Sequence, residues 1–210
     1  MKRILVSIVA VVMTLTLIAC GNTVKKPAMY IEKAQLSVQE ENIAKLLGAN
    51  SEHLIYDFKL DDNVKSVQIN TYELINGAWK MVSGGGGQAF SDYKGRLALG
   101  FENLAEGLRV ALQSEHSSGS TQFSTEPTED FAGMARATSI LNDQTEITYE
   151  QEIPLVIQIS TSQNSVSSYD VKYFFTPEEY EKHGYEHIYA ITIRFSQKTV
   201  GELDTINQQQ

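Results

Sequence analysis

The feature that most constrains the fold is the dipeptide Asn76-Gly77, which separates two strand-like runs between Val67 and Val82. Asn-Gly is typical of the type I′ turn, whose twist matches that of two antiparallel strands. A two-residue turn also fixes which residues lie opposite each other. The sequence therefore predicts a β-hairpin with the pairs Ile75–Ala78, Leu74–Trp79, Glu73–Lys80 and Tyr72–Met81.

The predicted hairpin carries large apolar side chains on one face, Tyr72, Leu74, Trp79 and Met81. If this face is exposed, Tyr72 and Trp79 could stack on a sugar. Large apolar side chains are more often buried, so we favour a core role for this face.

Alternating apolar residues recur along the rest of the chain and indicate strands. The fold that we expect is mainly β: a single β-sandwich over residues 36–203, with an immunoglobulin-like arrangement as one form of it. Residues 114–130 are expected to be a long loop, residues 131–141 suit either a helix or a strand, and residues 204–210 are expected to be a polar tail. The strand-like runs lie at 54–60, 67–82, 97–101, 108–112, 146–161, 169–175 and 188–195.

Two short helices are expected beside these strands, at about 38–47 and 177–183. Ser37 and Glu40 have the spacing of a capping box at the start of the first helix. Thr176 and Pro177 suit the start of the second, and Gly184 suits its end.

The N-terminal segment has the pattern of an export signal. Lys2 and Arg3 precede an apolar run from Ile4 to Ile18, which is short for a spanning helix. The run ends Leu17-Ile18-Ala19-Cys20, which resembles the lipobox of bacterial membrane lipoproteins. A plain signal peptide and a single anchor helix are the alternatives.

The lipobox resemblance implies that residues 1–19 are a signal peptide and that Cys20 carries acyl chains such as palmitate. Residues 20–35 would then be the lipid anchor and tether, and the domain would lie on the extracytoplasmic face of a bacterial cell membrane. Cys20 is the chain's single cysteine, so the domain cannot form an internal disulfide.

The charge of the chain limits its partners. Without residues 1–19 the chain keeps 15 of its 17 basic residues, since Lys2 and Arg3 are removed, against 26 acidic ones (15 − 26 = −11). This balance argues against binding to nucleic acid.

Two motifs suggest chemistry. His183, Glu186 and His187 fit H-x-x-E-H, in which one helix presents both histidines to a zinc ion. Gly184 interrupts this motif, so we expect the helix to end at or before it. Gly84, Gly86 and Ala89 fit a loose dinucleotide pattern, but no helix is expected after them. We therefore expect no cofactor.

The function that we expect is a non-catalytic binding or interaction module of the cell envelope, whose partner is an envelope protein or a glycan. The rival is an envelope hydrolase or metal-dependent enzyme that uses His183, Glu186 and His187. A structural envelope protein without a small ligand is a third possibility.

Overall fold

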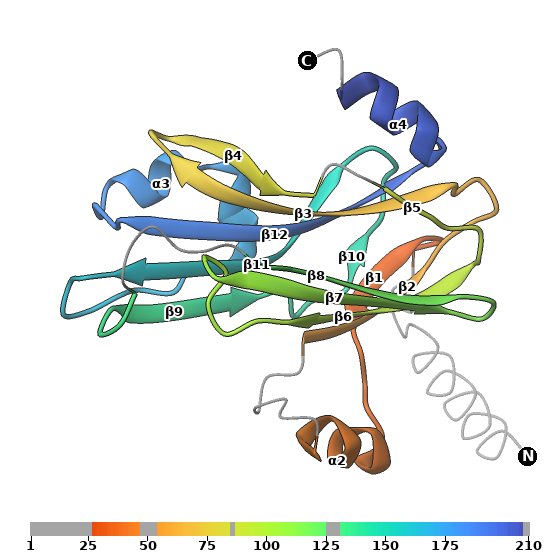
Figure 1. The fold of residues 1–210 in the computed structure, drawn as a ribbon, viewed down its shortest axis with the longest axis horizontal. Helices are drawn as coiled ribbons and strands as arrows, with labels where there is room; N and C mark the ends of the chain where they lie inside the picture. The colour runs from red at the N-terminus through yellow and green to blue at the C-terminus, as the bar shows by residue number, and fades with distance from the viewer. Residues whose placement is uncertain (1–26, 47–53, 85–86, 125–130, 208–210) are drawn as a thin grey trace, which may run out of the picture.

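The computed structural model describes residues 27–46, 54–84, 87–124 and 131–207. Their strands form two antiparallel sheets that pack face to face as a β-sandwich (Figure 1). The expected mainly β sandwich is confirmed, and its immunoglobulin-like form is not.

The first sheet, here called sheet A, has the strand order β10-β1-β2-β6-β7-β8. Its first two strands in the chain flank helix α2, and β6 to β8 follow one another as a meander. The strands are β1 (Tyr30–Lys33), β2 (Leu54–Lys59), β6 (Lys94–Gly100), β7 (Gly107–Ser114), β8 (Ser118–Ser124) and β10 (Thr145–Glu146).

The second sheet, sheet B, has the order β4-β3-β12-β11-β9, and β5 also pairs with β3. Pro154 marks a shift of register between β11 and β12, as a proline in a strand suggests. The strands are β3 (Ser66–Ile75), β4 (Ala78–Ser83), β5 (Gln88–Ala89), β9 (Ala135–Ile140), β11 (Glu152–Thr161) and β12 (His187–Ser196).

The core lies between the sheets and contains many large apolar side chains. Phe58 of sheet A packs against Phe195 of sheet B, with ring centroids 5.0 Å apart, and against Phe90 at 5.4 Å. Strand β11 is buried on both faces, because Val156 faces sheet A while Ile157 and Ile159 lie on the other side.

The predicted hairpin forms β3 and β4 with the four expected pairs, including Leu74 opposite Trp79 and Tyr72 opposite Met81, and the register shifts only beyond them, between Tyr72 and Thr71. Asn76 and Gly77 both have positive φ, 52° and 74°, as a type I′ turn requires. Local turn chemistry therefore sets the pairing of these two strands.

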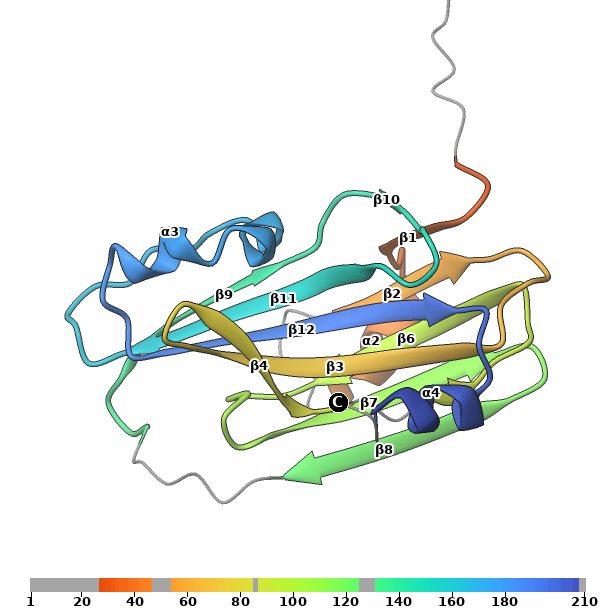
Figure 2. The same ribbon diagram turned by 90° about the horizontal axis from the view of Figure 1, so that it is seen from above.

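Helix α2 (Val38–Leu46) confirms the first predicted helix, and Ser37 and Glu40 cap it reciprocally. The second helix, α3 (Glu178–Glu181), is shorter than expected, and Pro177 takes the N-cap position expected for Thr176. A further helix, α4 (Val200–Asn207), includes residues 204–207 of the expected polar tail. Figure 2 shows α3 and α4 at opposite ends of the molecule.

Three other expectations differ from the structure. Residues 169–175 are not a strand, because Val171–Phe175 form a 3₁₀ helix, η2, whose first turn is capped by Asp170. The segment 114–130 is not simply a loop, because it contains β8 paired along β7. Residues 30–33 of the expected tether belong to sheet A as β1.

Candidate functional site

The three residues of the H-x-x-E-H motif do not lie on one helix. Helix α3 ends at Glu181, and Gly184 has a left-handed φ of 62°. His183 therefore lies in a turn, whereas His187 is the first residue of β12. This agrees with the expectation that the helix ends at or before Gly184.

Each of the three motif residues has partners of its own. The His183 ring stacks on Tyr185, and the His187 ring packs against Phe131 with centroids 4.8 Å apart. Glu186 accepts hydrogen bonds from the hydroxyls of Ser162 and Thr161, and these bonds lower the pKa of Glu186 to about 2. The side chains face different neighbours, so they do not form the zinc site of the motif.

A small acidic pocket of about 300 Å³ lies between the hairpin turn, α3 and the start of β12. Glu73, Glu181, Glu186 and His187 are among its lining residues. Tyr189 donates a hydrogen bond to Glu73, and His187 Nδ1 lies 3.8 Å from the same carboxylate. In the part of the chain that the structure describes, no group of three or more His, Cys, Asp or Glu side chains could hold a metal ion.

The aromatic face of the hairpin is covered by η2 and α3. The Trp79 ring stacks on Phe174 with centroids 5.1 Å apart, and its edge meets Tyr180 at 6.2 Å. The Tyr72 hydroxyl donates a hydrogen bond to Glu152, and burial raises the pKa of Tyr72. One face of the indole is thus already occupied, which agrees with a packing role for Tyr72 and Trp79.

The glycine-rich segment does not form a dinucleotide site of the expected type. Gly84 and Ala89 are described, whereas Gly86 lies outside the described residues. Strand β5 follows this segment, and no helix starts after Ala89 before β6 begins. The pattern therefore lacks the helix N-terminus that would bind a pyrophosphate.

Among the residues that the structure describes, an apolar cleft of about 320 Å³ lies between the two sheets. Sheet B contributes Val67 and Ile69 from β3, and sheet A contributes side chains from β7 and β8. We call this pocket the inter-sheet cleft. Its lining is Val67, Ile69, Ser83, Gly84, Gly87, Gln88, Leu108, Val110, Thr121 and Phe123.

The register of the strands explains why these side chains converge. Leu108 lies opposite Phe123 and Val110 opposite Thr121, so all four project from the same face of sheet A. Across the sandwich, Val67 and Ile69 alternate with Gln68 on β3, and they pair with Phe195 and Ile193 of the core. The cleft is therefore a continuation of the core toward one edge of the sandwich.

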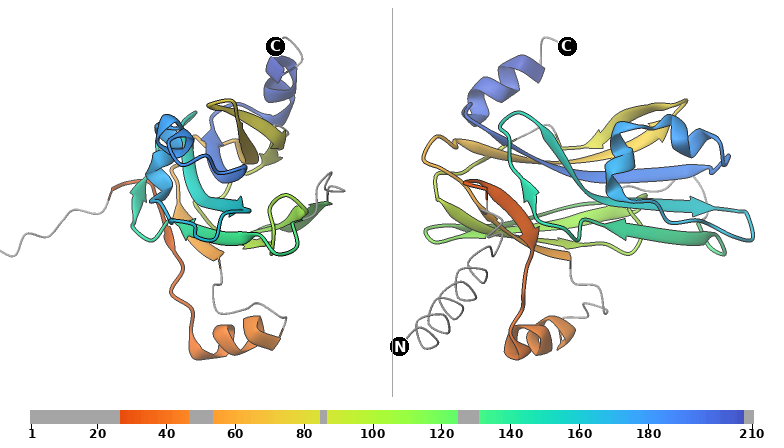
Figure 3. Two further views of the ribbon diagram at one scale, coloured as in Figure 1. Left: turned by 90° about the vertical axis from the view of Figure 1, so that its left-hand side faces the viewer. Right: turned by 180° about the vertical axis from the view of Figure 1, so that it is seen from behind.

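Beside the cleft, the pairing along the edge of sheet B is interrupted in the residues that the structure describes. Strand β4 pairs with β3 from Thr71 onward, whereas β5 pairs only with Ser66 and Val67. Ser83, Gly84 and Gly87, which line the cleft, lie in the sequence between the residues of these two pairings or at their ends. In Figure 3, left, the green strands at the edge of sheet A lie below the olive strand β4, the edge strand of sheet B.

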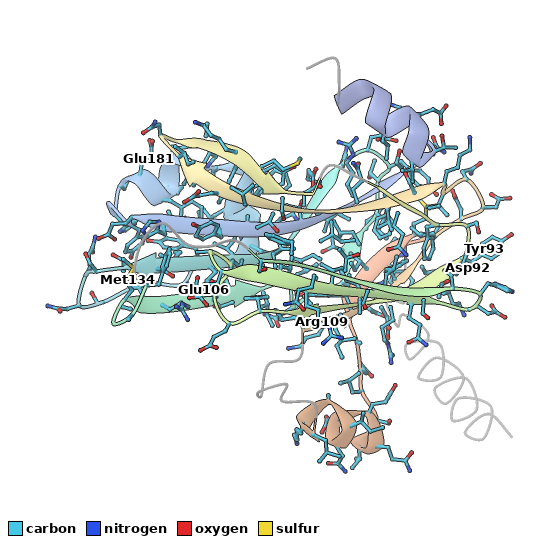
Figure 4. All side chains as sticks on the ribbon, viewed as in Figure 1. Asp92, Tyr93, Glu106, Arg109, Met134 and Glu181 are labelled. Carbon is cyan, nitrogen blue, oxygen red and sulfur yellow. The ribbon has the colours of Figure 1, made fainter. Side chains whose placement is uncertain are left out.

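The lining of the cleft contains no ionisable side chain. Ser83, Thr121 and Gln88 supply neutral hydrogen-bonding groups near the rim, and Val110, Ile69 and Phe123 remain partly exposed. The neighbouring residue Arg109 points out from the opposite face of sheet A (Figure 4). A pocket of this kind suits a small apolar ligand without charge.

The sequence alone did not identify the cleft. It predicted the strands that carry Val67, Ile69, Leu108 and Val110, but it assigned Phe123 to a loop. The spacing of Thr121 and Phe123, with polar residues between them, is a weak strand signal that could have extended the sheet.

The predicted lipid attachment site, Cys20, lies outside the described residues, as does the expected signal peptide 1–19. No described helix is long and apolar enough to cross a membrane. Comparisons of the chain with protein-family models, with curated proteins and with solved structures find no match.

Proposed function

We propose that this protein is an extracytoplasmic lipoprotein, held at the bacterial membrane through acylated Cys20, and that its sandwich is a non-catalytic binding module. The ligand that we assign to it is small, neutral and largely apolar, and it occupies the inter-sheet cleft. The resemblance of residues 17–20 to a lipobox supports the anchor. The uncharged apolar cleft supports the binding role.

The size and lining of the cleft limit the ligand. Its volume of about 320 Å³ is near the lower end of the range typical of small-molecule sites. An alkyl chain or a single ring system fits this space better than a glycan, whose many hydroxyls would lack partners on Val67, Leu108 and Val110. Ser83, Thr121 or Gln88 could bind one neutral polar group at the rim.

The rival enzyme function has less support. His183, Glu186 and His187 each contact other residues. Three glutamates and His187 line the pocket beside them, but most of its lining is uncharged. Trp79 is likewise a weaker candidate for glycan binding, because Phe174 stacks on it. The inter-sheet cleft is therefore the observation on which the proposal depends.

A photoreactive fatty alcohol tests the binding role. The full-length protein in vesicles is exposed to the probe and irradiated, and the labelled peptides are identified by mass spectrometry. We expect adducts on β3, β7 or β8, at residues that line the cleft. Labelling spread evenly over the exposed surface would contradict the proposal.

Two adjacent substitutions on β8 give a matched comparison. Thr121→Phe places a ring in the cleft beside Val110, whereas Ser120→Phe places the same ring on the opposite face of the strand. Both positions are exposed, so we expect both variants to fold, which thermal melting checks. Thr121→Phe should abolish the specific labelling and Ser120→Phe should keep it; equal labelling of the two variants would exclude the cleft as the site.

A further inference from the structure

Helix α2 exposes its apolar side chains to solvent. Val38, Ile43 and Leu46 are 73%, 58% and 85% exposed, and none of the nine residues of the helix is buried. Single exposed apolar residues are common on protein surfaces. Three of them on one short helix without a buried face are unusual, because helices of this length normally gain their stability from packing.

The orientation of α2 is set by its polar side. Glu40 accepts a hydrogen bond from Arg96 of β6 at 2.7 Å, and the same guanidinium contacts both carboxylate oxygens of Asp57 at 2.7 and 3.0 Å. At 3.6 residues per turn, Val38 and Leu46 lie on the side of the helix away from Glu40. The ion pair therefore turns Val38 and Leu46 away from sheet A, and Ile43, about one turn after Glu40, lies at the flank of the helix.

The position of α2 relates it to the proposed anchor. The helix stands on the outer side of sheet A, away from sheet B (Figures 1 and 3). Strand β1 begins at Tyr30, ten residues after Cys20, and ten extended residues span at most roughly 33–36 Å. Because α2 starts five residues after β1 ends at Lys33, an anchor at Cys20 keeps the helix near the bilayer.

We propose that α2 lies on the membrane surface and inserts Val38, Ile43 and Leu46 into the boundary between the lipid headgroups and the acyl chains. This inference rests on the proposed lipid anchor at Cys20. The anchor supplies a high local concentration of lipid, so that three apolar side chains suffice for a stable contact.

The charges on α2 indicate which lipid surface it contacts. The helix carries Glu40 and Glu41 against a single Lys45, and the chain as a whole is acidic. Anionic headgroups would repel it, so the contact is with zwitterionic lipid and depends on apolar burial. It turns the outer face of sheet A toward the membrane.

The single cysteine of the chain allows a direct test. With Cys20 acylated, a cysteine introduced at another position is the only free thiol, and it can carry an environment-sensitive fluorophore. Labels at Ile43→Cys and Leu46→Cys are compared with labels at Glu41→Cys, on the same helix, and Met81→Cys, in sheet B. The full-length protein is reconstituted in phosphatidylcholine vesicles that carry spin-labelled acyl chains.

We expect a blue shift and strong quenching at positions 43 and 46, and emission typical of water at positions 41 and 81. Replacing part of the lipid by an anionic lipid should weaken the quenching. Equal emission at positions 41, 43 and 46 in protein that floats with the vesicles would overturn the inference while leaving the anchor intact. Protein that does not float with the vesicles would instead contradict the anchor, and with it this inference.

Discussion

The indole nitrogen of Trp79 donates a hydrogen bond to the main-chain oxygen of Phe174, 2.8 Å away. This bond joins the β3–β4 hairpin to η2, two segments that are 95 residues apart in sequence. Because Phe174 also stacks on the indole, Trp79 holds the helical cover against the outer face of sheet B. Tyr72 and Trp79 of the hairpin are thereby partly buried beneath η2.

Trp79→Ala should lower the free energy of unfolding by about 3 kcal/mol, near the lower end of the range for large aromatic residues because the ring is only half-buried. Trp79→Phe keeps most of the apolar contact and loses the hydrogen bond, so its cost should be about 1 kcal/mol. Urea unfolding of the two variants measures both values. Unchanged stability of Trp79→Ala would show that η2 does not depend on the indole.

Gly95→Ala should destabilise the protein by roughly 1–3 kcal/mol. Gly95 lies opposite Phe58 on the core face of sheet A, and an added Cβ would overlap the Phe58 ring. The ring cannot move freely, because Phe90 and Phe195 pack against it. Thermal and urea unfolding provide the measurement.

Gly100→Ala is the matched control, at the other end of the same strand. A Cβ at Gly100 would make only ordinary contacts, with the nearest atom of Arg109 3.8 Å away. Its effect should stay within about 0.5 kcal/mol. Similar losses for both variants would point to a general requirement for glycine in β6 and not to the Phe58 contact.

Acid should remove a stabilising contribution of Glu186. Hydrogen bonds from Ser162 and Thr161 lower its pKa from 4.5 to about 2 in the folded protein. The folded state therefore binds the proton less readily than the unfolded chain, so this stabilisation is present above pH 4.5 and disappears as the pH falls toward 2. Glu186→Gln removes the titrating group and keeps a side-chain oxygen that can accept a hydrogen bond.

Urea unfolding between pH 7 and about pH 2.5 compares the two proteins. The other carboxylates titrate in both, so the difference between the curves reports on Glu186. We expect the original protein to be more stable than Glu186→Gln at pH 7 and the difference to shrink as the pH falls below 4.5. Parallel curves over the whole range would contradict the prediction. Because the side chain is exposed, the difference at pH 7 should be small.

Cys20→Ser should release the protein from the membrane fraction, because serine cannot carry the thioether-linked lipid. Fractionation of cells that express the two forms measures the change, and mass spectrometry of the N-terminus shows whether acyl chains are attached. If the variant remains in the membrane with a normally processed N-terminus, Cys20 is not the anchor.

Local chemistry alone determined several parts of this structure. The Asn76-Gly77 turn fixed the register of β3 and β4 next to it, because a two-residue turn allows only one register between the strands that it joins. Ser37 and Glu40 located the start of α2, and Gly184 indicated that no helix would continue to His187. The alternation of apolar residues gave the mainly β class. A similar signal was overlooked at α4, where Thr199 and Glu202 form a capping pair.

Other features depend on contacts between distant segments. Residues 171–175 alternate like a strand, but they form a 3₁₀ helix that packs on β11 and places Phe174 against Tyr72 and Trp79. Strand β8 has few apolar residues and forms because β7 offers it a full row of hydrogen-bonding partners. The inter-sheet cleft is the clearest case: Ile69, Val110 and Phe123 meet only because the two sheets pack face to face. The sequence set which side chains each strand carries, whereas the pairing and packing of the strands decided which of them converge.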